Sequence, residues 1–444
     1  MRPVDVIDPE FFAPDEPLTD RLPLLDAWLE RPELPNEPLA GYGALLVQHQ
    51  LSNQIPMLHA LLSLGLSPSD IWWLDIPYTS HVLVRDYAHE RLGIPRSQLV
   101  ESRFRILEPY ASYQHARVIE ILHAIAERKP AKLLVLDDGA YVLEGLASLA
   151  RHRWPERLTI VEQTTRGFIK LRESAALRNA ARELPLIDVA RSAPKRALEP
   201  PFIAMAVCAA LQPHLEKHFG AGFSGNCLVL GYGAIGEQVA TFVRRHFRLP
   251  DSRVYVHDPD LKAAALARQR RFPAWDREEL DTRFQLVIGC SGEASFKVGD
   301  STYLDDGAIL VSASSGAVEL SRQDFLELAD ASPSDDIKIA RDALDETNIH
   351  SDLSIHLVDR TVTFINGGFP VNFNGRLTVC PTRYIQPTPT MMVAAAVQAA
   401  QALDSGRHGI VAFDPGFYDW AHPRFRALLG ERAHWLEPVP EEAW

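Results

Sequence analysis

The sequence predicts a two-domain α/β protein in which one doubly wound domain is inserted into a second, split domain. Apolar segments with the length of buried strands alternate with helix-like segments of about a dozen residues, which is typical of βαβ units and parallel sheets. A glycine-rich turn, GYGAIG at 231–236, stands between one such apolar segment and a helix-like one. The length of 444 residues also exceeds what a single hydrophobic core usually serves.

The first half of the chain holds the predicted elements of the split domain. Residues 1–40 are rich in Pro, Asp and Glu and are expected to form a surface arm. Short apolar runs predict strands, and apolar residues at helical spacing predict helices. The predicted strands are 44–48, 71–74 and 132–136, and the predicted helices are 53–64, 81–92 and 112–128.

The second half holds the inserted domain and the return of the chain. After a helix at 203–219, strands are expected at 226–230, 253–257, 286–289 and 308–312, helices at 237–247 and 261–268, and a strand pair at 355–364. Four prolines predict irregular structure over 366–389, because proline lacks an N–H group and interrupts helices and strands. An Ala-rich helix at 391–403 and a Trp-containing tail at 405–444 follow.

Composition and charge exclude several classes of protein. The 45 Lys and Arg against 58 Asp and Glu give a net charge of −13, spread along the chain, which argues against nucleic-acid or anionic-membrane partners. The four cysteines show no CxxC spacing. His214 and His218 lack a third metal ligand, so no metal site is expected. Without a signal peptide or an apolar run of ~18–20 residues, a soluble cytoplasmic protein is expected.

The glycine-rich turn predicts a dinucleotide site. Gly231 permits the tight turn, Gly233 lets the backbone approach a pyrophosphate, and Gly236 allows close packing of helix on strand, with Ala234 and Ile235 at the start of the helix. The next predicted strand is followed by Asp258, whose carboxylate would bind the ribose diol and so favours NAD over NADP. The alternative is a glycine-rich turn without a cofactor.

Three further loops follow predicted strands, at the strand ends where ligands of open α/β sheets bind. They carry Cys290, then Ala313 and Ser315, and then Asn366, whose amide would meet the nicotinamide carboxamide or the substrate. Each loop has a plain turn as its alternative.

The first half offers its own polar candidates, which are His49, Asp137, Asp138, Gln163, Thr164, Thr165, Lys195 and Glu199. Asp138 ends an apolar strand, where a buried carboxylate must find a partner, although it could instead cap a helix. Lys195 and Glu199 are four residues apart and could form a surface ion pair. By itself His49 is typical of a buried core histidine.

The motifs, and their order along the chain, resemble those of the S-adenosyl-L-homocysteine hydrolase family. LVLDDGAYVLEGL resembles its LDDGGDLT segment, VEQTTRGFIKL its SEETTTGV segment, and LVLGYGAIGEQVA its NAD turn. LPLIDVARSAPKRALEP is similar to the stretch with the catalytic lysine and aspartate, and VTFINGGFP to the segment that ends in GHPSF. LVQHQLSNQIPMLHALLSLG aligns with the segment of the N-terminal catalytic histidine. The resemblance covers about 45–403.

This resemblance implies the roles of several residues. His49 and Asp138 would handle water and the leaving group, and Lys195, oriented by Glu199, would be the base for the ribose 3′-hydroxyl. Thr164, Thr165 and Asn366 would contact NAD. In the family, hydride moves from C3′ to NAD⁺, the 5′ substituent is eliminated, water adds, and the hydride returns. The implied partner is a thioether nucleoside, such as S-adenosylhomocysteine or a related ribosyl compound, and the implied assembly is a homo-oligomer, either dimer or tetramer.

The resemblance also implies the domain limits. The substrate domain would span 1–200 and 366–404, around an NAD-binding Rossmann domain at 205–362, and 405–444 would be a divergent tail.

The sequence departs from the family at positions near the expected site. The family's glutamate is replaced by Gln163, its asparagine by Pro200, and its two histidines by Ser315 and Phe369. The residues that read adenine correspond to Leu51 and Asn53. Gln163, Ser315 and Asn53 are therefore the expected substrate-binding positions with altered chemistry.

Two alternatives to a hydrolase of this type stay open. The chain could be a non-catalytic homologue that binds NAD and a nucleoside and acts as a regulatory partner, which the lost histidines favour. It could also be a dehydrogenase of the 2-hydroxyacid type, although no Arg/His catalytic pair follows the cofactor domain.

Overall fold

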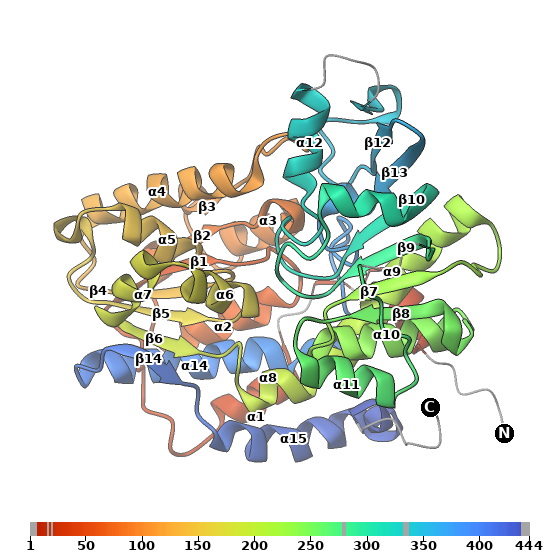
Figure 1. Cartoon of the computed structure of the whole chain (residues 1–444). Coiled ribbons are helices and arrows are strands. Elements are labelled where there is room, and N and C mark those ends of the chain that lie inside the picture. The colour runs from red at the N-terminus through yellow and green to blue at the C-terminus, as the bar shows by residue number, and fades with distance from the viewer. Residues whose placement is uncertain (1–6, 16, 19–20, 278–280, 332–336, 437–444) are drawn as a thin grey trace.

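Two seven-stranded sheets with helices on their faces form the described part of the chain (Figure 1). The computed structural model describes residues 7–15, 17–18, 21–277, 281–331 and 337–436. The expected α/β fold class is confirmed. The first six residues of the predicted split domain and the last eight of the predicted tail lie outside the described residues.

The strands of the first sheet are β1 (Tyr42–Val47), β2 (Ile71–Leu74), β3 (Leu99–Val100), β4 (Lys132–Asp137), β5 (Leu158–Glu162), β6 (Pro185–Asp188) and β14 (Gly409–Ala412). Those of the second sheet are β7 (Cys227–Leu230), β8 (Val254–His257), β9 (Phe284–Gly289), β10 (Leu304–Ser312), β11 (Lys338–Ile339), β12 (Leu353–Leu357) and β13 (Arg360–Phe364).

The helices of the first half are α1 (Pro23–Leu29), α2 (Gln54–Ser63), α3 (Val82–Glu90), α4 (Tyr110–Arg128), α5 (Tyr141–Ser148), α6 (Thr165–Glu173), α7 (Ala175–Arg182) and α8 (Ala193–Leu198). The later helices are α9 (Pro200–Phe219), α10 (Ala234–His246), α11 (Leu261–Gln269), α12 (Arg322–Ala331), α13 (Thr382–Ile385), α14 (Pro387–Asp404) and α15 (Gly416–Leu429).

The first sheet is entirely parallel, with the order β14-β6-β5-β4-β1-β2-β3. Helices α4 and α5 cover one face, and α2 and α14 cover the other (Figure 1). Because both faces are covered, the strands carry continuous apolar runs rather than alternating ones. Every residue of β1, β2 and β5 is buried, as this arrangement requires.

The second sheet has the order β11-β12-β13-β10-β9-β7-β8, and its central strands are parallel. The predicted strand pair is confirmed as the antiparallel hairpin of β12 and β13. Helices α9 and α10 pack on one face of the sheet and α12 on the other. Since α9 and α14 also contribute to the apolar cluster under the first sheet, one continuous core joins the two sheets.

The return segment (366–404) contains more helix than the sequence predicts, and the tail (405–444) contributes a strand to the first sheet. Helices α13 and α14 occupy 382–385 and 387–404, so the prediction of irregular structure over 366–389 is wrong from residue 382 onward. Proline is tolerated in the first helical turn, where its missing N–H group has no partner to lose. The tail supplies β14, which pairs in parallel with β6 at the edge of the first sheet. The N-terminal segment is also anchored, because Phe11, Leu24 and Trp28 are buried.

Candidate active site

Both sheets reverse their strand order beside a predicted site. In the first sheet β1 lies next to β4, and the chain winds away from them in opposite directions. In the second sheet the strand order reverses in the same way between the neighbouring strands β7 and β9. Ligands of open α/β sheets bind outside the carboxyl ends of the strands at such reversals. His49 and Asp138 follow β1 and β4, and Gly231 and Cys290 follow β7 and β9.

His49 and Asp138 form a largely buried pair at the first reversal. His49 Nε2 lies 3.2 Å from Asp138 Oδ2, and His49 Nδ1 lies 2.7 Å from Thr79 Oγ1. Thr79 Oγ1 donates its own hydrogen to the carbonyl oxygen of Ile76, so it can accept one from His49. Both ring nitrogens of His49 therefore face oxygen atoms that accept hydrogen bonds. This places His49 in a polar site rather than in an apolar core.

Asp138 is held as a carboxylate in a buried position. Burial would raise its pKa, but the charge of His49, hydrogen bonds from His49 and Gln163, and the charge of Lys195 together hold the pKa below its usual value. The Gln163 Nε2 group donates to Oδ2. Oδ1 is buried and has no hydrogen-bond partner among the described residues. An orphaned carboxylate oxygen is costly in a folded protein and marks a place where a ligand donor or a water molecule binds.

Asp137, rather than Asp138, caps helix α5. Asp137 accepts hydrogen bonds from the backbone N–H groups of Tyr141 (3.2 Å) and Val142 (2.8 Å) in the first turn of α5. Glu162 accepts from the N–H groups of Gly139 (3.1 Å) and Ala140 (2.7 Å), and Ala140 has a left-handed backbone with φ +55°. These two carboxylates fix the loop that aims Asp138 at His49.

Asp137 and Glu162 themselves are buried side by side on neighbouring strands, since they are register partners of β4 and β5. Burial raises the pKa of Asp137 to about 7, and burial and the charge of Asp137 raise the pKa of Glu162 well above its usual value. Glu162 is absent from the residues that the sequence predicts for the site, although a carboxylate at the end of an apolar strand is a usable signal.

Lys195 and Glu199 form a second charged pair, at α8. Lys195 Nζ lies 2.5 Å from Glu199 Oε2, and their side chains are 17% and 15% exposed. Thr388 donates a 2.8 Å hydrogen bond to the same Oε2 atom. An exposed surface ion pair is therefore not what the structure shows. The charge of Lys195 also contributes to the lowered pKa of Asp138, so the two charged pairs are close enough to interact electrostatically. Pro200 begins α9 directly after this pair.

The GYGAIG turn has the close packing that its glycines predict. A Cβ atom on Gly236 would lie 2.0 Å from the carbonyl oxygen of Gly231, whereas one on Gly233 would meet no atom within 4 Å. Gly231 has φ +92°, and Ala234 and Ile235 begin α10. The space over Gly233 is thus open, at the start of the helix.

Asp258 lies beside this turn. Its Oδ2 atom accepts a 2.6 Å hydrogen bond from the backbone N–H of Tyr232, and its Oδ1 accepts one of 2.8 Å from the N–H of Asp260. The carboxylate, which is half-buried, therefore spans the turn and the loop after β8.

The loop after β9 is organised by Glu319, which carried no signal that the sequence analysis used. Its carboxylate accepts hydrogen bonds of 2.7 Å from the backbone N–H groups of Ser291 and Gly292 and 2.8 Å from the Ser295 hydroxyl. Burial raises the pKa of Glu319, and burial together with the charge of Glu319 raises the pKa of Cys290. Cys290 is thus a packed thiol, which lies against Gly231 and Gly236.

The next loop carries Ala313 and Ser315. The N–H of Ala313 donates to Gly289 O over 2.8 Å, which ties this loop to the preceding one. The N–H of Gly316 donates to the Tyr78 hydroxyl over 3.0 Å, so the loop also contacts the first sheet's side of the site. Ser315 is half-buried beside this contact.

Thr164 and Thr165 occupy the start of α6. Thr164 Oγ1 donates to Glu162 Oε1 (2.6 Å) and accepts from the N–H of Gly167 (3.0 Å), whereas Thr165 is exposed. Arg166 donates to Gly292 O over 3.2 Å, which brings this helix start next to the loop after β9. The two predicted cofactor segments therefore adjoin each other across the two sheets.

Asn366 is buried and its side chain is fully engaged. Its amide donates to the carbonyl oxygens of Pro370 and Phe373, each over 2.8 Å, and its Oδ1 lies 2.8 Å from His350 Nδ1. In this state Asn366 shapes the 366–373 loop rather than offering a donor to a ligand. Asn53, at the start of α2, is half-buried and makes no capping hydrogen bond through its side chain.

The 366–373 loop brings two aromatic rings to His49. Phe373 stacks on His49 with a centroid distance of 4.7 Å, and Phe369 stacks on Tyr78 at 5.0 Å. Tyr78 is in turn 6.3 Å from His49. Phe373 and Tyr78 carried no recognisable signal in the sequence, because single aromatic residues are common in cores.

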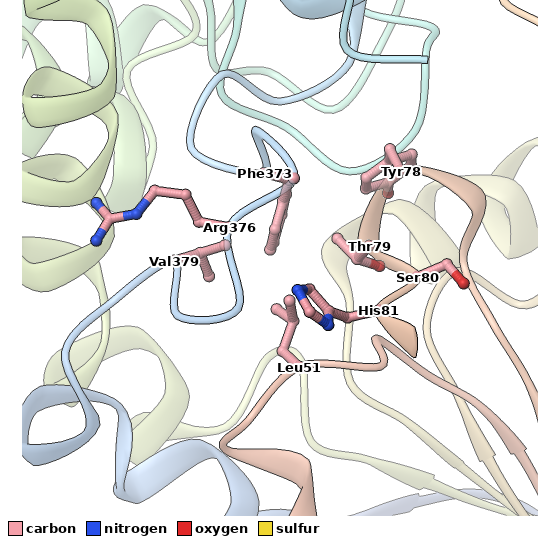
Figure 2. A pocket seen from close by; sticks show the side chains of 9 residues that line it. Leu51, Tyr78, Thr79, Ser80, His81, Phe373, Arg376 and Val379 are labelled. Atoms are coloured by element: carbon pink, nitrogen blue, oxygen red, sulfur yellow. The ribbon is translucent and has the colours of Figure 1, made fainter. Parts of the chain in front are cut away.

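A small recess adjoins this cluster (Figure 2). Its volume of about 10 Å³ is close to what one water molecule needs. It is lined by Leu51, Tyr78, Thr79, Ser80, His81, Phe373, Gly375, Arg376 and Val379. Its wall is shared with His49, because Phe373 and Tyr78 contact that ring and Thr79 binds it.

Within the described ranges, no helix has the length and apolar character that crossing a bilayer would need. The same residues contain no group of three or more His, Cys, Asp or Glu side chains placed to hold a metal ion.

Comparisons with known proteins add distant likenesses. No protein-family model matches the chain. Two uncharacterized proteins of Mycobacterium tuberculosis, from strains CDC 1551 / Oshkosh and H37Rv, are each 27% identical over 388 residues, covering 86% of this chain and 68% of the relative.

Solved structures with a similar chain path include two dipicolinate synthases. The one from Bacillus subtilis has a TM-score of 0.38 and 9% identity over 82% of this chain and 97% of its own. The one from Bacillus halodurans has a TM-score of 0.32 and is 10% identical, and the match covers 64% of this chain and 85% of that structure's chain. L-tryptophan dehydrogenase from Nostoc punctiforme has a TM-score of 0.28 and is 12% identical, and the match covers 66% of this chain and 72% of that structure's chain. Likenesses this distant assign no function to the chain.

Proposed function

We propose that this protein is an NAD-dependent enzyme that acts on a thioether nucleoside or a related ribosyl compound, by transient oxidation of the sugar, elimination and addition of water. The observations that support the proposal are two charged pairs that follow strands of the first sheet, His49 with Asp138 at the strand reversal and Lys195 with Glu199 after β6. The reversal of the second sheet bears the glycine-rich turn.

The residues at the second reversal fit a dinucleotide. The open space over Gly233 suits a pyrophosphate at the start of α10, where backbone N–H groups favour an anion. Gly231 and Gly236 keep the turn close to the helix, and the Asp258 carboxylate would accept hydrogen bonds from a ribose diol. When bound, NAD supplies a reversible acceptor of hydride.

The proposed acid–base work belongs to the two charged pairs of the first sheet. Lys195 Nζ would take the proton of a sugar hydroxyl, and Glu199, fixed by Thr388, would orient the amine. His49 would exchange a proton with water or with the leaving group, held by Asp138 and Thr79. The free Oδ1 of Asp138 is placed to accept a hydrogen bond from substrate or water.

Closure of the site would exclude water during these steps. The Tyr78–Gly316 and Arg166–Gly292 hydrogen bonds join the first sheet's loops to the second sheet's loops. We propose that residues 1–200 and 366–404 act as the substrate domain and 205–362 as the NAD domain, which close through these contacts.

The test uses the protein loaded with NAD and challenged with adenosine or S-adenosylhomocysteine. We expect the absorbance of the reduced nicotinamide to rise, and free thiol to appear with S-adenosylhomocysteine. Bound NAD with neither signal would support the non-catalytic alternative. Sustained net reduction with a 2-hydroxyacid would support a dehydrogenase instead.

Substitution of the proposed base sharpens the test. Lys195→Ala should abolish the transient reduction. Lys132→Ala is a matched control, because Lys132 also pairs with a carboxylate, Asp404 at 2.6 Å, but at the start of β4. If Lys195→Ala reduces the cofactor as the control does, Lys195 is not the base.

A further inference from the structure

A hollow of about 330 Å³ lies at the edge of the first sheet where its strands begin. This volume falls within the usual range of small-molecule pockets, roughly 300–1,000 Å³. The hollow is lined by Leu158 and Pro185, the first residues of β5 and β6, by His408 directly before β14, and by Asp404 at the end of α14. Because these strands are parallel to β4, the hollow lies at the opposite end of the sheet from Asp138, which follows β4.

Part of the wall of this hollow is apolar. Leu158 and Leu184 are buried, and Trp154 is half-buried. Trp154 Nε1 donates to the carbonyl oxygens of Leu146 over 2.9 Å and of Leu149 over 3.3 Å. The indole N–H is therefore engaged within the protein, and the ring offers carbon surface to a ligand. An apolar group placed against these side chains would be removed from water.

The polar part of the wall carries both signs of charge, because three arginines and three carboxylates line the hollow. One of the carboxylates, Asp404, already binds two cations, Lys132 at 2.6 Å and Arg157 at 2.8 Å. Arg151 stacks on Trp154, with 4.8 Å between its guanidinium carbon and the ring centroid. These charged groups are therefore engaged within the protein.

Arg407, Glu156 and Glu183 differ from these groups. All three are exposed, and their side chains make no hydrogen bond or ion pair with any residue that the structure describes. The loops that carry Arg407 and Glu183 adjoin each other, because His408 Nδ1 lies 3.1 Å from Glu183 O. An uncommitted guanidinium and an uncommitted carboxylate therefore stand on neighbouring loops of one hollow.

We infer that this hollow binds a free α-amino acid with a large apolar side chain. The carboxylate of the ligand would pair with Arg407, whose planar guanidinium matches a carboxylate in two parallel hydrogen bonds, and its ammonium group would pair with Glu183. Its side chain would lie against Trp154 and the buried leucines. A nucleotide or another polyanion would meet three carboxylates here, and a polyamine would meet three arginines. The inference is independent of the proposed function, because the hollow and the candidate active site lie at opposite ends of the first sheet.

The experiment titrates the full chain with L-phenylalanine and with two analogues that each lack one charge. 3-Phenylpropionate keeps the ring and the carboxylate but has no ammonium group, and 2-phenylethylamine keeps the ring and the ammonium group but has no carboxylate. By calorimetry we expect L-phenylalanine to bind roughly 10- to 150-fold more tightly than either analogue, which is the range for one hydrogen bond to a charged group. Equal affinities, tighter binding of either analogue, or no binding of L-phenylalanine would overturn the inference.

Two variants assign the two ends of the ligand. Arg407→Gln should weaken the binding of L-phenylalanine and 3-phenylpropionate but not of 2-phenylethylamine, whereas Glu183→Gln should weaken the binding of L-phenylalanine and 2-phenylethylamine but not of 3-phenylpropionate. Arg103→Gln is the matched control, because Arg103 is also exposed and its side chain also has no partner among the described residues, but it follows the carboxyl end of β3. If either variant binds L-phenylalanine as tightly as the control does, the hollow is not the site. The melting temperature verifies that the variants are folded.

Discussion

Gly233→Ala should separate the binding of the dinucleotide from the stability of the fold. Gly233 has φ −76° and ψ −165°, which any residue adopts, and a Cβ there meets no atom within 4 Å. The substitution restricts the unfolded chain, which stabilises by roughly 0.4–1 kcal/mol, and loses a few tenths through a poorer helix N-cap. The net change in the free energy of unfolding should therefore stay within about 1 kcal/mol.

The same methyl group would stand where the pyrophosphate approaches the backbone. We expect the affinity for NAD to fall at least ~10-fold, which corresponds to about 1.4 kcal/mol. The assay is calorimetric titration of nucleotide-free protein with NAD, with denaturant unfolding of the same samples. Gly236→Ala is the contrasting variant, because its Cβ would lie 2.0 Å from Gly231 O and should destabilise the fold itself. Wild-type affinity in folded Gly233→Ala protein would refute a pyrophosphate over this turn.

Three more outcomes are expected. Asp138→Asn should lower the rate of free-thiol release from S-adenosylhomocysteine by roughly 10²–10⁴-fold, because the charge that holds His49, which would exchange a proton with the leaving group, is lost; an unchanged rate would contradict this role. Asp137, whose pKa burial raises to about 7, holds a proton in the folded state that the unfolded chain releases above pH ~4, so its contribution lowers stability as pH rises from about 4 to 7. Denaturant unfolding at pH 5 and pH 8 should show a smaller pH dependence in Asp137→Asn, and an equal dependence would exclude this residue as its source. Arg322 is 1% exposed, its Nε and Nη2 have no partner among the described residues, and burial lowers its pKa to about 10. Arg322→Met should raise the free energy of unfolding by roughly 1–3 kcal/mol, and a loss of stability would show that the guanidinium is paired in solution.

Much of this site can be predicted from local sequence, because parallel strands end in polar residues at one edge of a sheet. The apolar run before Asp137 and Asp138 identifies a buried strand. The GYGAIG turn indicates its own geometry, because a Cβ atom on Gly231 or Gly236 would clash with neighbouring backbone atoms. The predicted roles of His49, Lys195 and Glu199 came from the resemblance, since by themselves these residues are typical of a core histidine and a surface ion pair; the structure pairs His49 with Asp138 and Lys195 with Glu199.

The alternation of strands and helices and the chemistry available at the strand ends follow from the amino-acid order alone, because periodicity, glycine conformation and apolar runs are local properties. Tertiary packing decided which aspartate caps α5 and which faces His49, that the Asn366 amide is used inside its own loop, and that the tail adds β14 to the first sheet. These outcomes depend on which loops from distant parts of the chain meet, such as Phe373 on His49 and Glu319 beneath Ser291. Such contacts are set by the order of strands in the sheets, which no single segment of the chain encodes.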